Sequence, residues 1–212
     1  MNTLFTPRPF TSANRQRAIT EVLENTVPDR DFYLLVLGAV AFAICAIFTD
    51  SIATLIASMI VAPLAYPILG LALSIIAGDL RLAARSIGML IISLIAAIAL
   101  AWLATMAFGH VRVDPVMISF GGNLYIATII ALLAGAIAAY GLVRTKVGGA
   151  MTGIGIAVSL MPPLVATGIA IADGDSALAS QAFTIFLLNV IGIMAASALV
   201  FGLFGLRKEY KS

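Results

Sequence analysis

The sequence has few charged residues, one cysteine and one histidine. Only 10% of its 212 residues are charged, whereas 62% are apolar. A soluble domain carries about 25% charged residues, so this composition cannot build a water-facing surface, and we expect lipid to be the solvent. The net charge of +2 is small, and no basic cluster with interleaved aromatic residues occurs. These absences argue against a nucleic-acid partner.

The motifs of common enzymes and cofactor sites are also missing. Cys45 has no second cysteine with which to form a disulfide within the chain. No H-E-x-x-H, G-x-S-x-G or G-x-x-x-x-G-K-[ST] pattern occurs. We therefore expect a protein that is not an enzyme and that holds no cofactor or metal ion. Charged residues are absent from the interior of the long apolar runs, which argues against a proton pump or a voltage sensor.

Six charge-free runs make up most of the chain, and each is long enough to cross a bilayer, which takes about 20 apolar residues. They cover residues 32–49, 51–78, 86–109, 115–143, 147–172 and 176–206. None alternates with a period of two, as barrel strands would. We predict an all-α, polytopic membrane protein with a six-helix transmembrane domain over 32–206 and tails over 1–31 and 207–212. Since the first run begins only at Phe32, we expect no cleaved signal peptide.

The basic residues predict the orientation of these spans. Eleven of the twelve Lys and Arg residues fall on one side, and only Arg112 falls on the other. By the positive-inside rule, both termini are expected in the cytoplasm, with the protein in the plasma (inner) membrane of a prokaryote. In the first tail, Ala18, Ile19 and Val22 share one face of a helix that would begin near Ser12. This pattern predicts a short interfacial helix, and a frayed polar tail is the alternative.

Prolines interrupt two of the predicted spans. The second span contains Pro63 and Pro67, and the fifth contains Pro162 and Pro163. Proline lacks a backbone donor and clashes with the preceding helical turn, and in lipid each freed carbonyl needs another partner. We therefore predict that helices two and five are broken at mid-membrane. A kink that only shapes helix packing is the alternative.

The two interruptions occupy matching places. Spans two and five are the middle members of two groups of three, and a shift of one hundred residues superposes Pro63 on Pro163 and Ile56 on Ile156. A repeat of three spans must insert in opposite senses, so we predict two inverted three-helix repeats. Paired interrupted segments of this kind indicate a central solute site in secondary transporters.

Uncharged polar residues and the prolines define the predicted solute site. Free N–H groups at the starts of half-helices would suit a small polar or anionic solute. Hydrogen bonding between helices is the alternative role for the hydroxyl and amide groups. Asp50 opens the second span and would cap it or hold an ion. The candidate solute-site residues are Ser58, Pro63, Tyr66, Pro67, Ser159, Pro162, Pro163, Thr167 and Asn189.

These segments also carry a family resemblance. The stretches APLAYPI at 62–68 and VSLMPPL at 158–164 are the most specific, and DFYLLVL and FLLNVIGI add to them. Together they resemble the bacterial and archaeal hydrophobic-domain family known as domain of unknown function 389 (DUF389). The resemblance covers roughly residues 31–206 and implies a multi-pass membrane protein, of which this chain is a short, core-only form. It implies no function, because the family has no settled one.

Two functions are compatible with this sequence. The first is a secondary transporter or channel-like protein for a small polar or anionic solute, which would use the two broken helices. The second is a non-transporting membrane scaffold that organises lipid or a partner protein. The expected partners are the lipid bilayer, the solute and further copies of the chain in a homo-oligomer.

Overall fold

The computed structural model describes residues 11–111, 113, 123–144 and 160–210, and these residues form helices and no strand. The helices are α1 (Ser12–Asn25), α2 (Arg30–Phe48), α3 (Ile52–Val61), α4 (Ala65–Ala77), α5 (Leu80–Phe108), α7 (Leu124–Val143), α9 (Met161–Ala172), α10 (Ser176–Leu203) and α11 (Leu206–Tyr210).

Four of these helices, α2, α5, α7 and α10, are long and apolar enough to cross a membrane. Helices α3 and α4 together make a fifth such segment, bent by 49° where they meet. Helix α9 is apolar but has only 12 residues, and the rest of the fifth predicted span lies outside the described residues. Four to five of the apolar runs predicted from the sequence are therefore confirmed as membrane-type helices, and the exact number of six spans stays a prediction.

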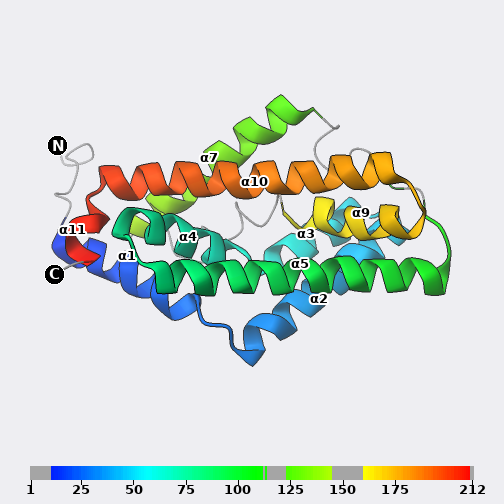
Figure 1. Cartoon of the computed structure of the whole chain (residues 1–212), viewed down its shortest axis with the longest axis horizontal. Coiled ribbons are helices and arrows are strands. Elements are labelled where there is room, and N and C mark those ends of the chain that lie inside the picture. Colours follow the sequence, from blue (N-terminus) through cyan, green and yellow to red (C-terminus); the bar gives the residue numbers. More distant parts are fainter. Residues whose placement is uncertain (1–10, 112, 114–122, 145–159, 211–212) are drawn as a thin grey trace, which may run out of the picture.

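Two long helices frame the molecule. Helices α5 and α10 run along its long axis in opposite directions, with α4 near one end and α9 near the other (Figure 1). Each of these two short helices packs against both α5 and α10. The described core consequently contains two half-length helices, one at each end, held between the same pair of long helices.

The two halves share an order of elements. Helix α9 begins 96 residues after α4 (161 and 65), and α10 begins 96 residues after α5 (176 and 80). Both short helices are followed by a left-handed glycine, Gly78 or Gly174, with φ of 75° and 72°. An aspartate then caps the long helix. Asp79 accepts from the N–H of Leu82 at 3.0 Å, and Asp175 accepts from the N–H of Leu178 at 2.9 Å. The helix starts thus lie 96 residues apart, whereas the match of Pro63 to Pro163 has a shift of one hundred.

Helix α7 is attached through a close crossing with α10. A Cβ placed on Gly135 would lie 2.4 Å from the backbone oxygen of Ile193, so only glycine permits this approach. The Ser197 hydroxyl donates to the Gly135 carbonyl at 3.0 Å beside the crossing. The first half of α7 projects away from the other described helices (Figure 1).

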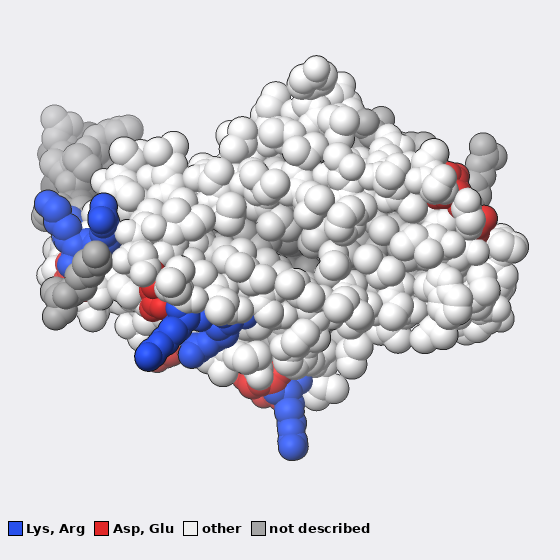
Figure 2. All heavy atoms as spheres, viewed as in Figure 1, with Lys and Arg blue, Asp and Glu red and all other residues white. Residues whose placement is uncertain are grey.

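The surface is apolar along the sides and charged at the ends. Many large apolar side chains are exposed, among them Leu34, Ile95, Ile137 and Leu199, each at 60% or more. In the view of Figure 2, Lys and Arg gather at the end formed by α1 and α11 and on the adjoining lower face, with acidic atoms beside them, and the described atoms at the opposite end show acidic groups alone. Exposed apolar sides with charged ends suit a body surrounded by lipid.

Helix α1 spans Ser12–Asn25, close to the helix expected in the N-terminal segment. Its residues Ala18, Ile19 and Val22 are buried, and the helix packs against α4, α7 and α11. The apolar face that the sequence assigned to the membrane interface therefore packs on the protein. The cytoplasmic placement of this segment stays a prediction.

Candidate functional site

The second apolar run is broken at Pro63. The backbone ladder of α3 ends where the N–H of Ala62 donates to the Ser58 carbonyl at 3.1 Å. Because Pro63 has no N–H, the Met59 carbonyl loses its helical donor. Helix α4 then starts at Ala65 in a new direction. The break predicted in this span is confirmed, and it brings together the end of one helix and the start of another.

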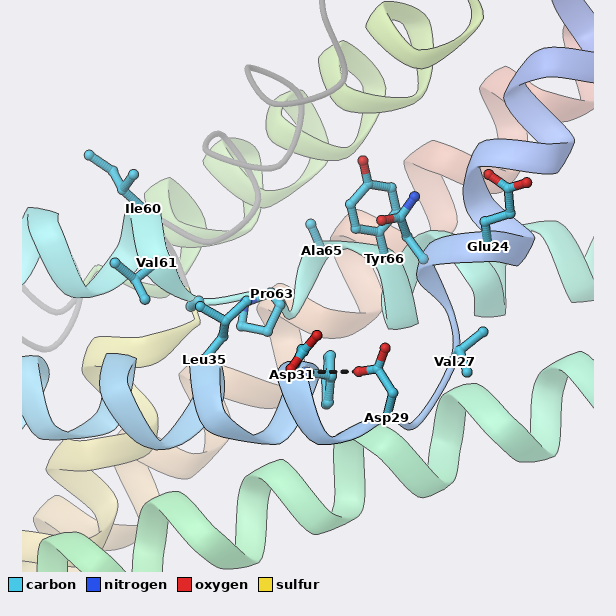
Figure 3. A pocket seen from close by; sticks show the side chains of 13 residues that line it. Glu24, Val27, Asp29, Asp31, Leu35, Ile60, Val61, Pro63, Ala65 and Tyr66 are labelled. Carbon is cyan, nitrogen blue, oxygen red and sulfur yellow. Dashed lines mark hydrogen bonds between the residues drawn. The ribbon is translucent and has the colours of Figure 1, made fainter.

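A pocket of about 420 Å³ lies beside this break. Its walls come from the end of α1, the linker that follows, the first turns of α2 and the residues around Pro63. Figure 3 shows Asp29 and Asp31 on the α2 side, and Pro63, Ala65 and Tyr66 on the α4 side. The lining residues are Glu24, Asn25, Val27, Asp29, Asp31, Phe32, Leu35, Ile60, Val61, Ala62, Pro63, Ala65 and Tyr66.

The pocket is acidic on one side and apolar on the other. Glu24, Asp29 and Asp31 contribute three carboxylates, and no Lys or Arg is among the described residues that line the pocket. Asp29 also caps α2, since its Oδ1 accepts from the N–H of Phe32 at 2.8 Å. Negative charge at the start of α2 is favourable because of the helix dipole, so the fold tolerates these carboxylates without a basic partner in the pocket. The field inside the pocket favours a cationic or neutral polar group over an anion.

Tyr66 joins the pocket to α1. Its side chain lines the cavity, and its hydroxyl donates to the Glu21 carboxylate with an oxygen–oxygen distance of 3.2 Å. Tyr66 is the second residue of α4, directly after the break. A hydrogen bond therefore connects the N-terminal helix to the first turn of the broken span.

Thr26 makes a second connection at the same place. It is fully buried, and its hydroxyl lies 2.7 Å from the Val22 carbonyl and 3.2 Å from the Tyr66 carbonyl. Gly70 permits this contact, because a Cβ there would lie 3.0 Å from Thr26 Oγ1 and 2.6 Å from Ser86 Oγ. The end of α1 is consequently packed into a glycine notch on α4.

Two arginines hold the other end of α1 on the protein. Arg15 Nε donates to the Phe204 carbonyl at 2.9 Å, and Arg17 Nη2 donates to the Leu142 carbonyl at 3.3 Å. Arg15 also lies 3.7 Å from the Glu209 carboxylate. Cations at the C-terminal ends of helices satisfy carbonyls that lack helical donors. Helix α1 thus bridges the ends of α7 and α10 to the wall of the pocket.

The second proline pair begins a helix. Pro162 and Pro163 lie in the first turn of α9, which starts at Met161. Proline suits this place, since the N–H that it lacks would have no helical acceptor. The first turn of α9 therefore offers few N–H donors, which weakens the anion site predicted there. Ser159, the candidate just before this helix, lies outside the described residues, as does the segment in which the break of the fifth span was predicted.

The predicted solute-site residues do not all meet at the pocket. Pro63 and Tyr66 line it, whereas the other described candidates do not. Ser58 and Thr167 are buried and donate to carbonyls of their own helices at 2.7 Å. Asn189 is 2% exposed within α10. The remaining candidates, Pro67, Pro162 and Pro163, are buried in the first turns of α4 and α9.

Asp50 lies in the turn between α2 and α3. It has a left-handed backbone with φ of 52°, and the oxygen that caps α3 is that of Ser51, which accepts from the N–H of Thr54 at 3.3 Å. The capping role predicted for Asp50 therefore belongs to its neighbour. Within residues 11–111, 123–144 and 160–210, no three His, Cys, Asp or Glu side chains are arranged to hold a metal ion.

The acidic residues of the pocket were missed by sequence reasoning. Glu24, Asp29 and Asp31 precede the first apolar run, so the sequence places them in a tail. A local signal was available: Pro28 ends α1 and Asp29 caps α2, which leaves only a four-residue turn between the two helices. A turn that short holds the charged end of α1 beside the membrane helices.

The helices and the exposed apolar surface together define an integral membrane protein. The family model described as "Domain of unknown function (DUF389)" matches residues 59–195, and the chain belongs to this family. A relative from Methanocaldococcus jannaschii, "Uncharacterized protein MJ0678", is 33% identical over 199 residues, which cover 90% of this chain and 61% of the relative. The chain thus spans about 61% of that relative's length. No solved structure matches the chain.

Proposed function

We propose that this protein is a secondary transporter or channel-like protein whose solute binds in the pocket at the α3–α4 break. The observation that carries the proposal is the 420 Å³ cavity beside a broken apolar helix, with three carboxylates in its lining. Irregular backbone in a membrane helix is tolerated where it lines a cavity, and broken helices are where transporters bind their solutes.

The lining selects the solute. Glu24, Asp29 and Asp31 repel an anion, and they do not form a cluster that could ligate a single metal ion. A small organic cation or a neutral polar molecule fits both facts. We therefore replace the polar or anionic solute expected from the sequence with a polar or cationic one.

The repeated order of elements supports an inverted repeat. Half-helix, left-handed glycine, capping aspartate and long helix follow one another twice at a separation of 96 residues. The two long helices run in opposite directions (Figure 1), as inverted repeats require. The basic end formed by α1 and α11 supports cytoplasmic termini in a prokaryotic plasma membrane.

Flux into proteoliposomes tests the proposal. A panel of radiolabelled small organic cations, neutral polar molecules and organic anions is assayed with the wild-type chain, with Asp31→Asn and with the matched control Asp173→Asn, whose carboxylate lies at the far end of α9. We expect uptake of at least one cation or neutral molecule, reduced several-fold by Asp31→Asn and unchanged by the control. Absence of uptake across the panel would refute transport.

A non-transporting scaffold is the second candidate, and one observation favours it. Three leucines at the starts of the two half-helices are buried, with Leu64, Leu160 and Leu164 at 1% exposure or less. Dry packing at these helix starts would suit a rigid body better than a solute path. The same flux assay separates the two functions, because a scaffold moves no solute.

A further inference from the structure

We propose that α1 is a gate in the sense of a movable wall of the pocket, held in place by a clasp made of Glu21, Thr26 and Tyr66; this inference rests on the proposed function. The clasp is formed by two hydrogen bonds between α1 and α4. The Tyr66 hydroxyl donates to Glu21 at 3.2 Å, and the Thr26 hydroxyl lies 3.2 Å from the Tyr66 carbonyl. Both meet the same residue, which stands directly after the helix break and lines the pocket.

The clasp lies where it controls the cavity. Glu24 and Asn25, in the last turn of α1, are part of the pocket wall. Any motion of α1 away from α4 removes this wall and frees the Tyr66 ring. The pocket therefore widens when the clasp opens, and it keeps its observed size when the clasp is closed.

The polar contacts that hold α1 on the protein are suited to a reversible motion. Arg15 and Arg17 donate to the carbonyls of Phe204 and Leu142, and Arg85 Nη1 reaches the Thr26 carbonyl at 3.4 Å. Arg15 also lies 3.7 Å from the Glu209 carboxylate. Each polar contact of this type adds little net stability, so α1 is held by several weak contacts in addition to its buried apolar face.

Accessibility of a cysteine in the pocket tests the gate. Cys45→Ala removes the single native thiol, and Val61→Cys then places a reporter on the α3 side of the cavity, away from the clasp. The protein is reconstituted in lipid nanodiscs, and the rate of modification by a cationic methanethiosulfonate is measured. Tyr66→Phe and Glu21→Leu are each expected to raise the rate at least threefold. The control Tyr125→Phe removes the hydroxyl of a tyrosine on α7 that is 84% exposed and should leave the rate unchanged.

A reversible lock supplies the opposite test. The Cβ position at Gly70 lies 3.0 Å from both Thr26 Oγ1 and Thr26 Cγ2, which suits a disulfide between Thr26→Cys and Gly70→Cys. Ser86→Ala removes the hydroxyl that would otherwise meet the new side chain at 2.6 Å. With this lock oxidised, modification of the reporter should be at least fivefold slower than after reduction and removal of the reductant.

Equal rates in the clasp variants, the locked protein and the parent, with unchanged melting temperatures, would overturn the gate. The gate and the transport proposal fail separately. If no solute in the panel is taken up but modification still depends on the clasp, transport is refuted and the gate stands. If uptake occurs while modification ignores the clasp, the gate is refuted and transport stands.

Discussion

Helices α4 and α9 are two versions of the same half-length element, and they differ in what surrounds their first turn. Both pack between α5 and α10, and both carry proline in the first turn. The start of α4 lies beside the acidic pocket, with Pro63 and Tyr66 partly exposed, whereas α9 is buried over residues 161–170. Proline thus fixes where a half-helix begins, and the neighbouring chain decides whether a cavity forms there.

The largest effect is expected from the packing of α9. A Cβ on Gly168 would lie 2.6 Å from the Ile98 backbone oxygen and 2.7 Å from Ala101 Cβ. Since backbone cannot move aside as a side chain can, Gly168→Ala should destabilise the protein by about 2–3 kcal/mol. The check is thermal unfolding in detergent, and a melting temperature within one degree of wild type would contradict the close approach.

Replacing proline with alanine should affect solute uptake differently at the starts of α4 and α9. Pro63→Ala restores a donor for the Met59 carbonyl and lets α3 continue toward α4, so solute uptake should fall at least tenfold. Pro163→Ala only adds an N–H within a first turn that needs no helical acceptor, and uptake should change less than twofold. Equal losses in the two variants would show that the break at Pro63 has no special role.

A methyl group added where α4 meets α5 should destabilise the protein less than one added where α9 meets α5. The nearest atom to a Cβ on Gly70 is Ser86 Oγ, a side-chain atom that is buried and has no hydrogen-bond partner among the described residues. Gly70→Ala should therefore cost about 1 kcal/mol, and adding Ser86→Ala should recover part of it. Melting temperatures of the single and double variants test this, and no recovery would place the strain on Thr26 instead.

The carboxylates of the pocket should modestly favour modification of the Val61→Cys reporter by a cationic over an anionic reagent. Each of Glu24→Gln and Asp31→Asn should lower the ratio of cationic to anionic methanethiosulfonate modification by about two- to threefold, as expected for one partly screened charge. The control Tyr125→Cys, at a position on α7 that is 84% exposed, should show no such dependence. An unchanged ratio at the reporter would mean that the carboxylates do not set the field in the pocket.

The smallest effect concerns pH at the turn that follows α4. The Tyr210 hydroxyl, followed by the backbone N–H of Leu82, holds the pKa of Asp79 below its usual value. Burial and the Asp79 carboxylate raise the pKa of Tyr210 to about 12. The stability that this pair contributes should be fully present from above the usual pKa of an aspartate up to about pH 10. It is lost in acid as Asp79 protonates, and in base as pH rises from about 10 to about 12. Tyr210→Phe should flatten both limbs of the melting-temperature profile.

Local rules accounted for much of the fold. Apolar runs located the long helices, the break at Pro63 followed from its missing N–H, and the apolar residues around Ile19 indicated α1. The pocket could not be predicted in this way, because Glu24 and Asp31 become its lining only when α1 folds back onto α4. Matching Pro63 to Pro163 gives a shift of one hundred residues, whereas the glycine and aspartate that follow each short helix recur after 96.

The arginine contacts of α1 have a consequence for biosynthesis. Arg15 binds the carbonyl of Phe204, which leaves the ribosome almost two hundred residues later, and Arg17 binds that of Leu142. Helix α1 therefore completes its native contacts only after α10 has been made and inserted. Until then the carboxylate-lined cavity lacks one wall, so a nascent chain would not yet hold the complete pocket.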